Sequence, residues 1–136
     1  MSIFQELLLG FQVALSLHNL FFCFVGVTFG TLIGVLPGIG PVTGVAILIP
    51  ITFGLSATTA IITMAGVYYG AMYGGSTTSI LINVPGESSS VMTTLDGYQM
   101  AKQGRAGPAL GMAAFSSFIA GTFAVVLLTF IAPPLA

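Results

Sequence analysis

Charge is nearly absent from this chain. Among its 136 residues, two are Lys or Arg, three are Asp or Glu, and 56% are hydrophobic. A soluble domain carries roughly 25% charged residues, and the 4% present here cannot cover a folded surface in water. The apolar residues also occur in long runs, unlike the amphipathic stripes of helices in soluble proteins. These features predict an all-α integral membrane protein.

The same composition excludes several classes of function. A formal net charge of −1 provides no basic surface for nucleic acid. Cys23 is the only cysteine, so neither an internal disulfide nor a multi-cysteine metal site can form, and no metal site is expected. His18 has no partner cysteine or repeated carboxylate near it, and Glu87 and Asp96 fall in a polar stretch. No catalytic residue is therefore predicted, and the chain is not expected to be an enzyme.

The order of the apolar runs predicts a single membrane domain over residues 1–136 with about three to four transmembrane helices. Residues 1–16 alternate apolar and polar side chains at helical spacing, which predicts a helix lying in the membrane interface. Spans are predicted over residues 17–36 and 107–132, because each is an apolar run of about the 20 residues that a crossing needs. Pro133 and Pro134 are predicted to end the last span.

Two segments between these spans are irregular. Residues 37–53 are short and interrupted by proline, so they are predicted to be broken or re-entrant, and a full crossing stays open as the alternative. Residues 57–83 are long enough to cross, but glycines and hydroxyl residues interrupt them, which predicts a discontinuous span. Both segments therefore carry backbone that can leave the regular helix.

Residues 84–106 form the predicted water-exposed loop, with four of the five charged residues. Lys102 and Arg105 are the only basic residues, and the positive-inside tendency places the loop in the cytoplasm. Ser88 is predicted to cap a short helix that reaches Gly97 or beyond, because its hydroxyl oxygen can accept from free backbone donors.

Glycines recur at every fourth position in two places, a spacing that puts them on one helix face. The rows are Gly26, Gly30, Gly34 and Gly38, and then Gly66, Gly70 and Gly74, with Gly107 and Gly111 as a shorter repeat. Lipid provides no hydrophobic drive between helices, so close approach depends on small residues. The two rows predict tight helix pairing, and packing alone is sufficient to explain them.

The segment from Pro37 to Gly44 cannot continue a regular helix, because it holds two prolines and three glycines. Pro41 suits the first turn of a new helix, whose free N–H groups would point back into the break and favour an anion. Transporters use such breaks at membrane depth to bind carboxylates. The alternative is a tight turn between helices at the membrane surface.

The segment from Gly74 to Ser79 adds four hydroxyls that could donate to a carboxylate or accept a sodium ion. The alternative is that they bond back to their own helix. Asn83 could contribute from the rim. The predicted substrate-binding residues are Pro37, Gly38, Gly40, Pro41, Thr43, Gly74, Gly75, Ser76, Thr77, Thr78, Ser79 and Asn83.

Several motifs together resemble a known family. They read GTLIGVLPGIGP at residues 30–41, YYGAMYGGSTTSIL at 68–81, NVPGE at 83–87, LDGY at 95–98 and GRAGPALG at 104–111. In sequence, order and spacing they resemble the large membrane subunit, the TctA family, of the bacterial tripartite tricarboxylate transporters.

This resemblance implies a multi-pass secondary transporter in the bacterial inner membrane. It would work with a small membrane subunit and a periplasmic solute-binding protein that delivers citrate or a related carboxylate. An ion gradient would drive transport without ATP, no cofactor is expected, and sodium is a candidate coupling ion. Family members continue for several helices beyond this sequence, so the chain is expected to be the N-terminal part of one half of a transporter.

Two other hypotheses stay open from the residues. The chain could be a small membrane protein that moves nothing and packs or assembles through its glycine-rich helix faces. It could also be an oligomeric channel whose pore is lined by the hydroxyls of Ser76 to Ser79. Carboxylate transport, which the resemblance implies, is the leading hypothesis, with Pro37 to Gly44 and Gly74 to Ser79 expected to supply half of the site.

Overall fold

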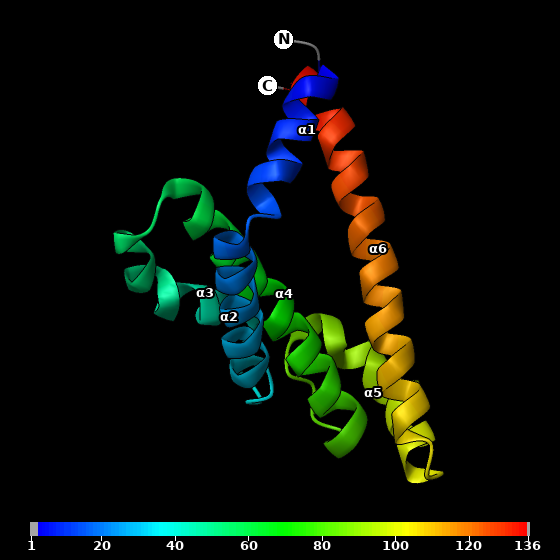
Figure 1. Ribbon diagram of the computed structural model, residues 1–136. Coiled ribbons are helices and arrows are strands. Elements are labelled where there is room, and N and C mark those ends of the chain that lie inside the picture. Colours follow the sequence, from blue (N-terminus) through cyan, green and yellow to red (C-terminus); the bar gives the residue numbers. More distant parts are fainter. Residues whose placement is uncertain (1–2, 136) are drawn as a thin grey trace.

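The computed structural model describes the backbone of residues 3–135 and the side chains of residues 4–132. Residues 1, 2 and 136, the outer limits of the predicted membrane domain, lie outside the described part. Within that part every regular element is helical (Figure 1), which confirms the predicted all-α class. The elements are α1 (Ile3–Ala14), α2 (Leu17–Gly34), α3 (Pro41–Leu48), η1 (Ile49–Gly54), α4 (Ala57–Ile82), η2 (Ser88–Ser90), α5 (Val91–Lys102) and α6 (Ala106–Leu135), where η1 and η2 are 3-10 helices.

Two of the described helices are long and apolar enough to cross a membrane. They are α2, over 18 residues, and α6, over the 27 residues Ala106–Ala132. The helix α4 has 26 residues, but its glycines and hydroxyls make it less apolar than these two. The apolar segment Pro41–Gly54, formed by α3 and η1, is shorter. The two long apolar helices, α2 and α6, support a membrane protein. The place of α1 in the membrane interface stays a prediction.

Local signals set most helix boundaries. The hydroxyl of Ser16 accepts from the backbone N–H of Asn19 at the start of α2, and that of Ser56 accepts from Thr59 at the start of α4. Pro41 occupies the first turn of α3, as predicted. Asn83 adopts a left-handed conformation, with φ of 60°, directly after α4 and ends that helix.

The pair of α2 and α4 forms the centre of the molecule, and glycine makes this contact possible. A Cβ atom added at Gly26, Gly30 or Gly34 would overlap the backbone of α4 at Thr63, Val67 or Ala71. In return, a Cβ added to the second glycine row would overlap the backbone of α2 at Cys23, Val27 and Thr31. The predicted tight pairing of the two glycine faces is therefore confirmed, with backbone packed directly on backbone.

The other glycines of the predicted rows behave differently. Gly38 lies beyond the end of α2 and has φ of +84°, a left-handed conformation that favours glycine. No atom lies within 4 Å of a Cβ built at Gly38, Gly107 or Gly111. Only the first three members of the α2 row and the three members of the α4 row therefore form a contact.

The last helix, α6, lies apart from this pair. It begins beside α5 and α4, where Ala109 is buried, and then diverges until its end approaches α1 (Figure 1). None of the 18 residues in its most apolar stretch is buried. The described part of the chain is thus a packed pair of helices with one long helix exposed beside it.

Two predicted boundaries are wrong. The helix α6 continues through Pro133 and Pro134 to Leu135, because the φ angle that proline fixes is also the φ angle of a helix. The predicted cap at Ser88 is also misplaced, since Glu87 caps η2 and the α-helix α5 begins at Val91. Most of the predicted loop 84–106 is therefore helical, and its cytoplasmic side stays a prediction.

Candidate functional site

The first predicted break in the helices is present between α2 and α3. The chain turns after Gly34, with the N–H of Ile39 donating to the carbonyl oxygen of Leu36 at 3.2 Å. Gly40 precedes α3 without a side-chain cap, and the first backbone bond of the helix runs from the N–H of Gly44 to the oxygen of Gly40 at 3.1 Å. The N–H groups of Val42 and Thr43 precede that bond, so the helix leaves them without an internal acceptor.

This break opens onto a cavity of about 610 Å³. One wall is the start of α3, and the opposite wall is the segment between α4 and α5. The residues that line it are Gly38, Gly40, Pro41, Val42, Tyr68, Met72, Pro85, Gly86, Glu87, Ser88 and Ser89. The fold therefore joins two segments that lie more than 40 residues apart, and the joined segments carry the NVPGE and GTLIGVLPGIGP motifs.

The second predicted break does not exist. The helix α4 is continuous through Gly74 to Ser79, and none of these residues lines the cavity. The hydroxyls of Ser76 and Thr77 donate to the carbonyl oxygens of Met72 and Tyr73 at 3.2 and 3.0 Å, and Ser79 donates to Gly75 at 2.9 Å. The prediction of a discontinuous span is wrong, because these hydroxyls bond to their own helix instead of interrupting it.

Thr78 and Gly75 serve the site from a distance. The hydroxyl of Thr78, which is buried, donates to the carbonyl oxygen of Val35 at 2.9 Å and to that of Gly74 at 3.2 Å. The bond from Thr78 to Val35 ties α4 to the end of α2 directly before the break. A Cβ on Gly86 would overlap the Cα of Gly75, so the second wall of the cavity rests closely on α4.

The remaining predicted residues take other places. Pro37 and Thr43 are exposed and do not line the cavity. Asn83 is also exposed, and its role is to end α4. Of the predicted set, the structure therefore brings together Gly38, Gly40 and Pro41 in one cavity. Gly75 and Thr78 of α4 support that cavity from outside.

Glu87 is the main residue of the cavity that sequence reasoning missed. Its side chain is half-buried and accepts from the hydroxyl of Ser89 at 2.7 Å and from the backbone N–H of Ser90. The hydroxyl of Ser90 in turn accepts from the N–H of Glu87 at 3.2 Å. Sequence reasoning assigned Glu87 to a water-exposed loop, and only the position of this carboxylate directly after Pro85 and Gly86 offered a signal for a structured turn.

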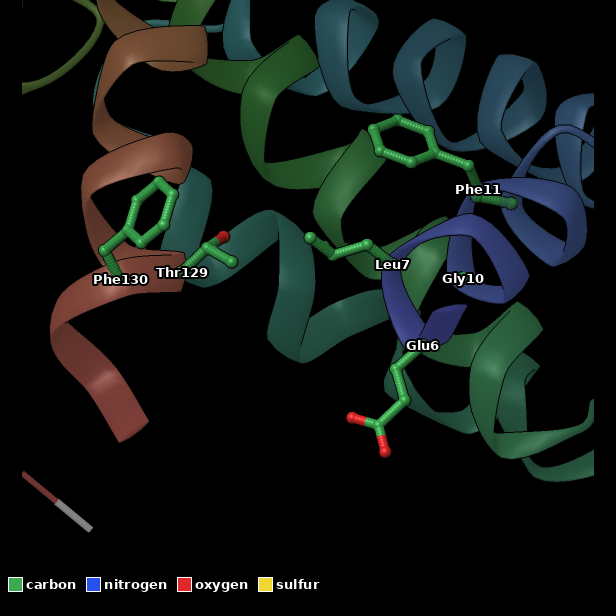
Figure 2. A pocket seen from close by; sticks show the side chains of 7 residues that line it. Glu6, Leu7, Gly10, Phe11, Thr129 and Phe130 are labelled. Carbon is green, nitrogen blue, oxygen red and sulfur yellow. The ribbon is translucent and has the colours of Figure 1, made fainter. Parts of the chain in front are cut away.

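Two larger cavities are lined mainly by apolar side chains. The first, of about 700 Å³, lies between α1 and α6 and is lined by Glu6, Leu7, Gly10, Phe11, Ala14, Thr129 and Phe130. Figure 2 shows Leu7 reaching toward Thr129, while the side chain of Glu6 points in a different direction from that of Leu7. The second, of about 640 Å³, lies between α4 and α6. Neither brings converging polar groups together as the break before α3 does, so that break is the candidate site.

The helical fold, the two apolar spans and the broken backbone before α3 define an integral membrane protein. Residues 20–136 match the Tripartite tricarboxylate transporter TctA family, and the chain belongs to this family. The resemblance read from the sequence motifs is thereby confirmed.

One curated relative extends this finding. Over all 136 residues the chain is 60% identical to an uncharacterized 52.8 kDa protein in the TAR-I ttuC' 3' region of Agrobacterium vitis. The chain covers 27% of the length of that relative. No solved structure matches the chain.

Proposed function

We propose that this chain forms part of the large membrane subunit of a transporter that moves a tricarboxylate such as citrate, or a related carboxylate. The subunit would be a multi-pass protein of the bacterial inner membrane, driven by an ion gradient. It would receive its substrate from a periplasmic solute-binding protein and work with a small membrane subunit. Family membership over residues 20–136 supports this proposal.

The cavity before α3 is the observation that carries the carboxylate assignment. The free N–H groups of Val42 and Thr43 belong to the positive end of α3, and Val42 lines the cavity. Helix N-termini of this kind bind carboxylates in transporters that have broken helices. Tyr68, Ser88 and Ser89 add hydroxyls to the lining, so the substrate would be held by hydrogen bonds without a lysine or arginine.

Substituting Gly40 tests this site. No atom lies within 4 Å of a Cβ built there, so the Cβ that Gly40→Leu adds at the cavity overlaps nothing in the fold. We expect loss of radiolabelled citrate uptake by cells that carry the complete transporter, with normal amounts of the subunit in the membrane. Gly54→Leu is the matched control, because Gly54 has equal space, lies in η1 and does not line the cavity. Normal uptake by Gly40→Leu would contradict the site.

The two competing hypotheses lose their main support in the fold. A protein that assembles with others through its glycine faces needs those faces free, whereas the rows of α2 and α4 cover each other. A channel lined by the hydroxyls of Ser76 to Ser79 needs them unengaged, whereas they donate to backbone oxygens. Carboxylate transport is the function that the described contacts support best.

A further inference from the structure

We infer that Glu87 binds a monovalent cation, a proton or a sodium ion, and that this binding is linked to binding of the anionic substrate. The inference rests on the proposed function and assigns the coupling of cation and substrate to a single carboxylate. It follows from where the carboxylate is held, from the charges around it and from what shares its cavity.

The Glu87 carboxylate has a fixed place beside the cavity. Its two donors, the Ser89 hydroxyl and the Ser90 N–H, come from the same turn. The turn itself is anchored to α4, because Gly86 packs on the backbone of Gly75 and the Glu87 Cγ lies 3.7 Å from a Cβ built at Gly75. A carboxylate held in this way stays at the cavity while the substrate enters and leaves.

No cationic side chain neutralises Glu87 in the described part of the chain. Among the described residues, the carboxylate accepts hydrogen bonds only from its own turn, and the Lys102 ammonium lies 5.8 Å from the centre of the Tyr98 ring instead. The polar side chains that line the same cavity belong to Tyr68 of α4 and to Ser88 and Ser89 of the Glu87 turn, and the start of α3 contributes backbone. The described residues therefore supply no cation that pairs with this carboxylate.

An anionic substrate at the start of α3 would share a cavity of about 610 Å³ with this carboxylate. Two negative charges within one cavity repel each other in a protein environment, and we take the corresponding change in substrate affinity to be on the order of tenfold. A proton or sodium ion on Glu87 removes the repulsion. By linkage, the cation strengthens substrate binding and the substrate strengthens cation binding by the same factor.

Glu87→Gln tests the inference, because it keeps the size and hydrogen-bond acceptor of the side chain and removes its charge. The measurement is citrate binding by isothermal titration calorimetry to the complete native subunit in lipid nanodiscs. One series replaces choline by sodium at constant pH, and a second lowers the pH in choline alone. We expect the native protein to bind citrate about tenfold more tightly as the coupling cation increases. Glu87→Gln should bind tightly throughout, with only the pH dependence that belongs to citrate itself.

The two series identify the cation, and the controls separate the possible failures. Asp96→Asn removes the same charge from α5, outside this cavity, and should respond to cations as the native protein does. Glu87→Asp keeps the charge, so it should retain the cation dependence even if Glu87→Gln does not fold. Equal cation dependence in the native protein and Glu87→Gln would overturn the inference and leave the proposed function intact. A native subunit that binds no citrate under any condition would overturn both.

Discussion

Two regions of the molecule, the contact between α2 and α4 and the exposed helix α6, contain the same residue types but differ in packing. Both regions are apolar and carry glycines four residues apart. In the first, six glycines are covered by the backbone of the other helix, whereas Gly107 and Gly111 of α6 have no atom within 4 Å of an added Cβ. A glycine row therefore marks a helix contact only where a second row of the same spacing faces it.

The two regions also differ in the partners of their side-chain hydrogen bonds. Asn19 is buried between α2 and α4, accepts from the Thr59 hydroxyl at 2.8 Å and donates to the carbonyl oxygen of Val13, also at 2.8 Å. In α6, the hydroxyls of Thr122 and Thr129 donate only to their own helix, at 2.7 and 2.8 Å. Asn19 and Thr59 thus connect two helices that touch, whereas the two α6 hydroxyls bond only within their own helix.

The largest effect is expected from a side chain placed in the glycine contact. Gly30→Leu would force the backbones of α2 and α4 apart at Val67, and we expect a loss of about 3 kcal/mol or more in the free energy of unfolding. Unfolding by SDS in mixed micelles measures this value. Gly111→Leu in α6 is the matched control and should change it by less than about 0.5 kcal/mol. Equal losses in the two variants would show that both regions are packed alike.

A smaller effect is expected when the buried amide is removed. Asn19→Leu deletes both bonds of the side chain and leaves the Ser16 N–H, at 3.2 Å, as the donor to the Val13 oxygen, so we expect a loss of about 1 to 2 kcal/mol in the same assay. Thr122→Val in α6 removes a hydroxyl that bonds only within its helix. That control should leave the free energy of unfolding nearly unchanged. An Asn19→Leu variant as stable as the native protein would show that these hydrogen bonds do not stabilise the interface.

The smallest effect is expected at Thr78. Thr78→Val removes the bond to Val35 at the end of α2 while keeping the shape of the side chain, so we expect a loss of about 0.6 kcal/mol, an average value for such bonds in membrane proteins. Thr77→Val, next to it, removes a bond to Tyr73 within α4 alone and should cost less. If the two variants are equal in unfolding free energy, Thr78 does not hold the start of the break.

Local signals made part of this fold predictable. The lack of charge, the glycine spacing within each row and the start of α3 at Pro41 are all visible in residues close together in the chain, and the structure agrees with what they predict. The break at Gly74 to Ser79 was wrongly predicted for a local reason as well. Glycines and hydroxyls weaken an isolated helix, but here α2 covers the glycine face and the hydroxyls bond within the turn.

The candidate site was only half visible in the sequence. A break in the backbone is predicted by Gly38, Gly40 and Pro41. Gly38 has a positive φ angle, and Pro41 has no N–H, so neither continues the helix before it. Glu87 carries no comparable signal, since an acidic residue after a Pro-Gly turn is ordinary in an exposed loop. Its place in the cavity depends on the packing of Gly86 against Gly75.

The sequence by itself determined that the chain is helical and suited to lipid, where its helices can approach closely, and where the backbone between α2 and α3 must open. These properties depend on composition and on residues within one or two helical turns. The tertiary structure alone decided which glycine row meets which, that α4 stays continuous, and that Glu87 shares a cavity with the start of α3. Such contacts join residues more than 40 positions apart, and they are set by the register in which two helices pack, which no local pattern encodes.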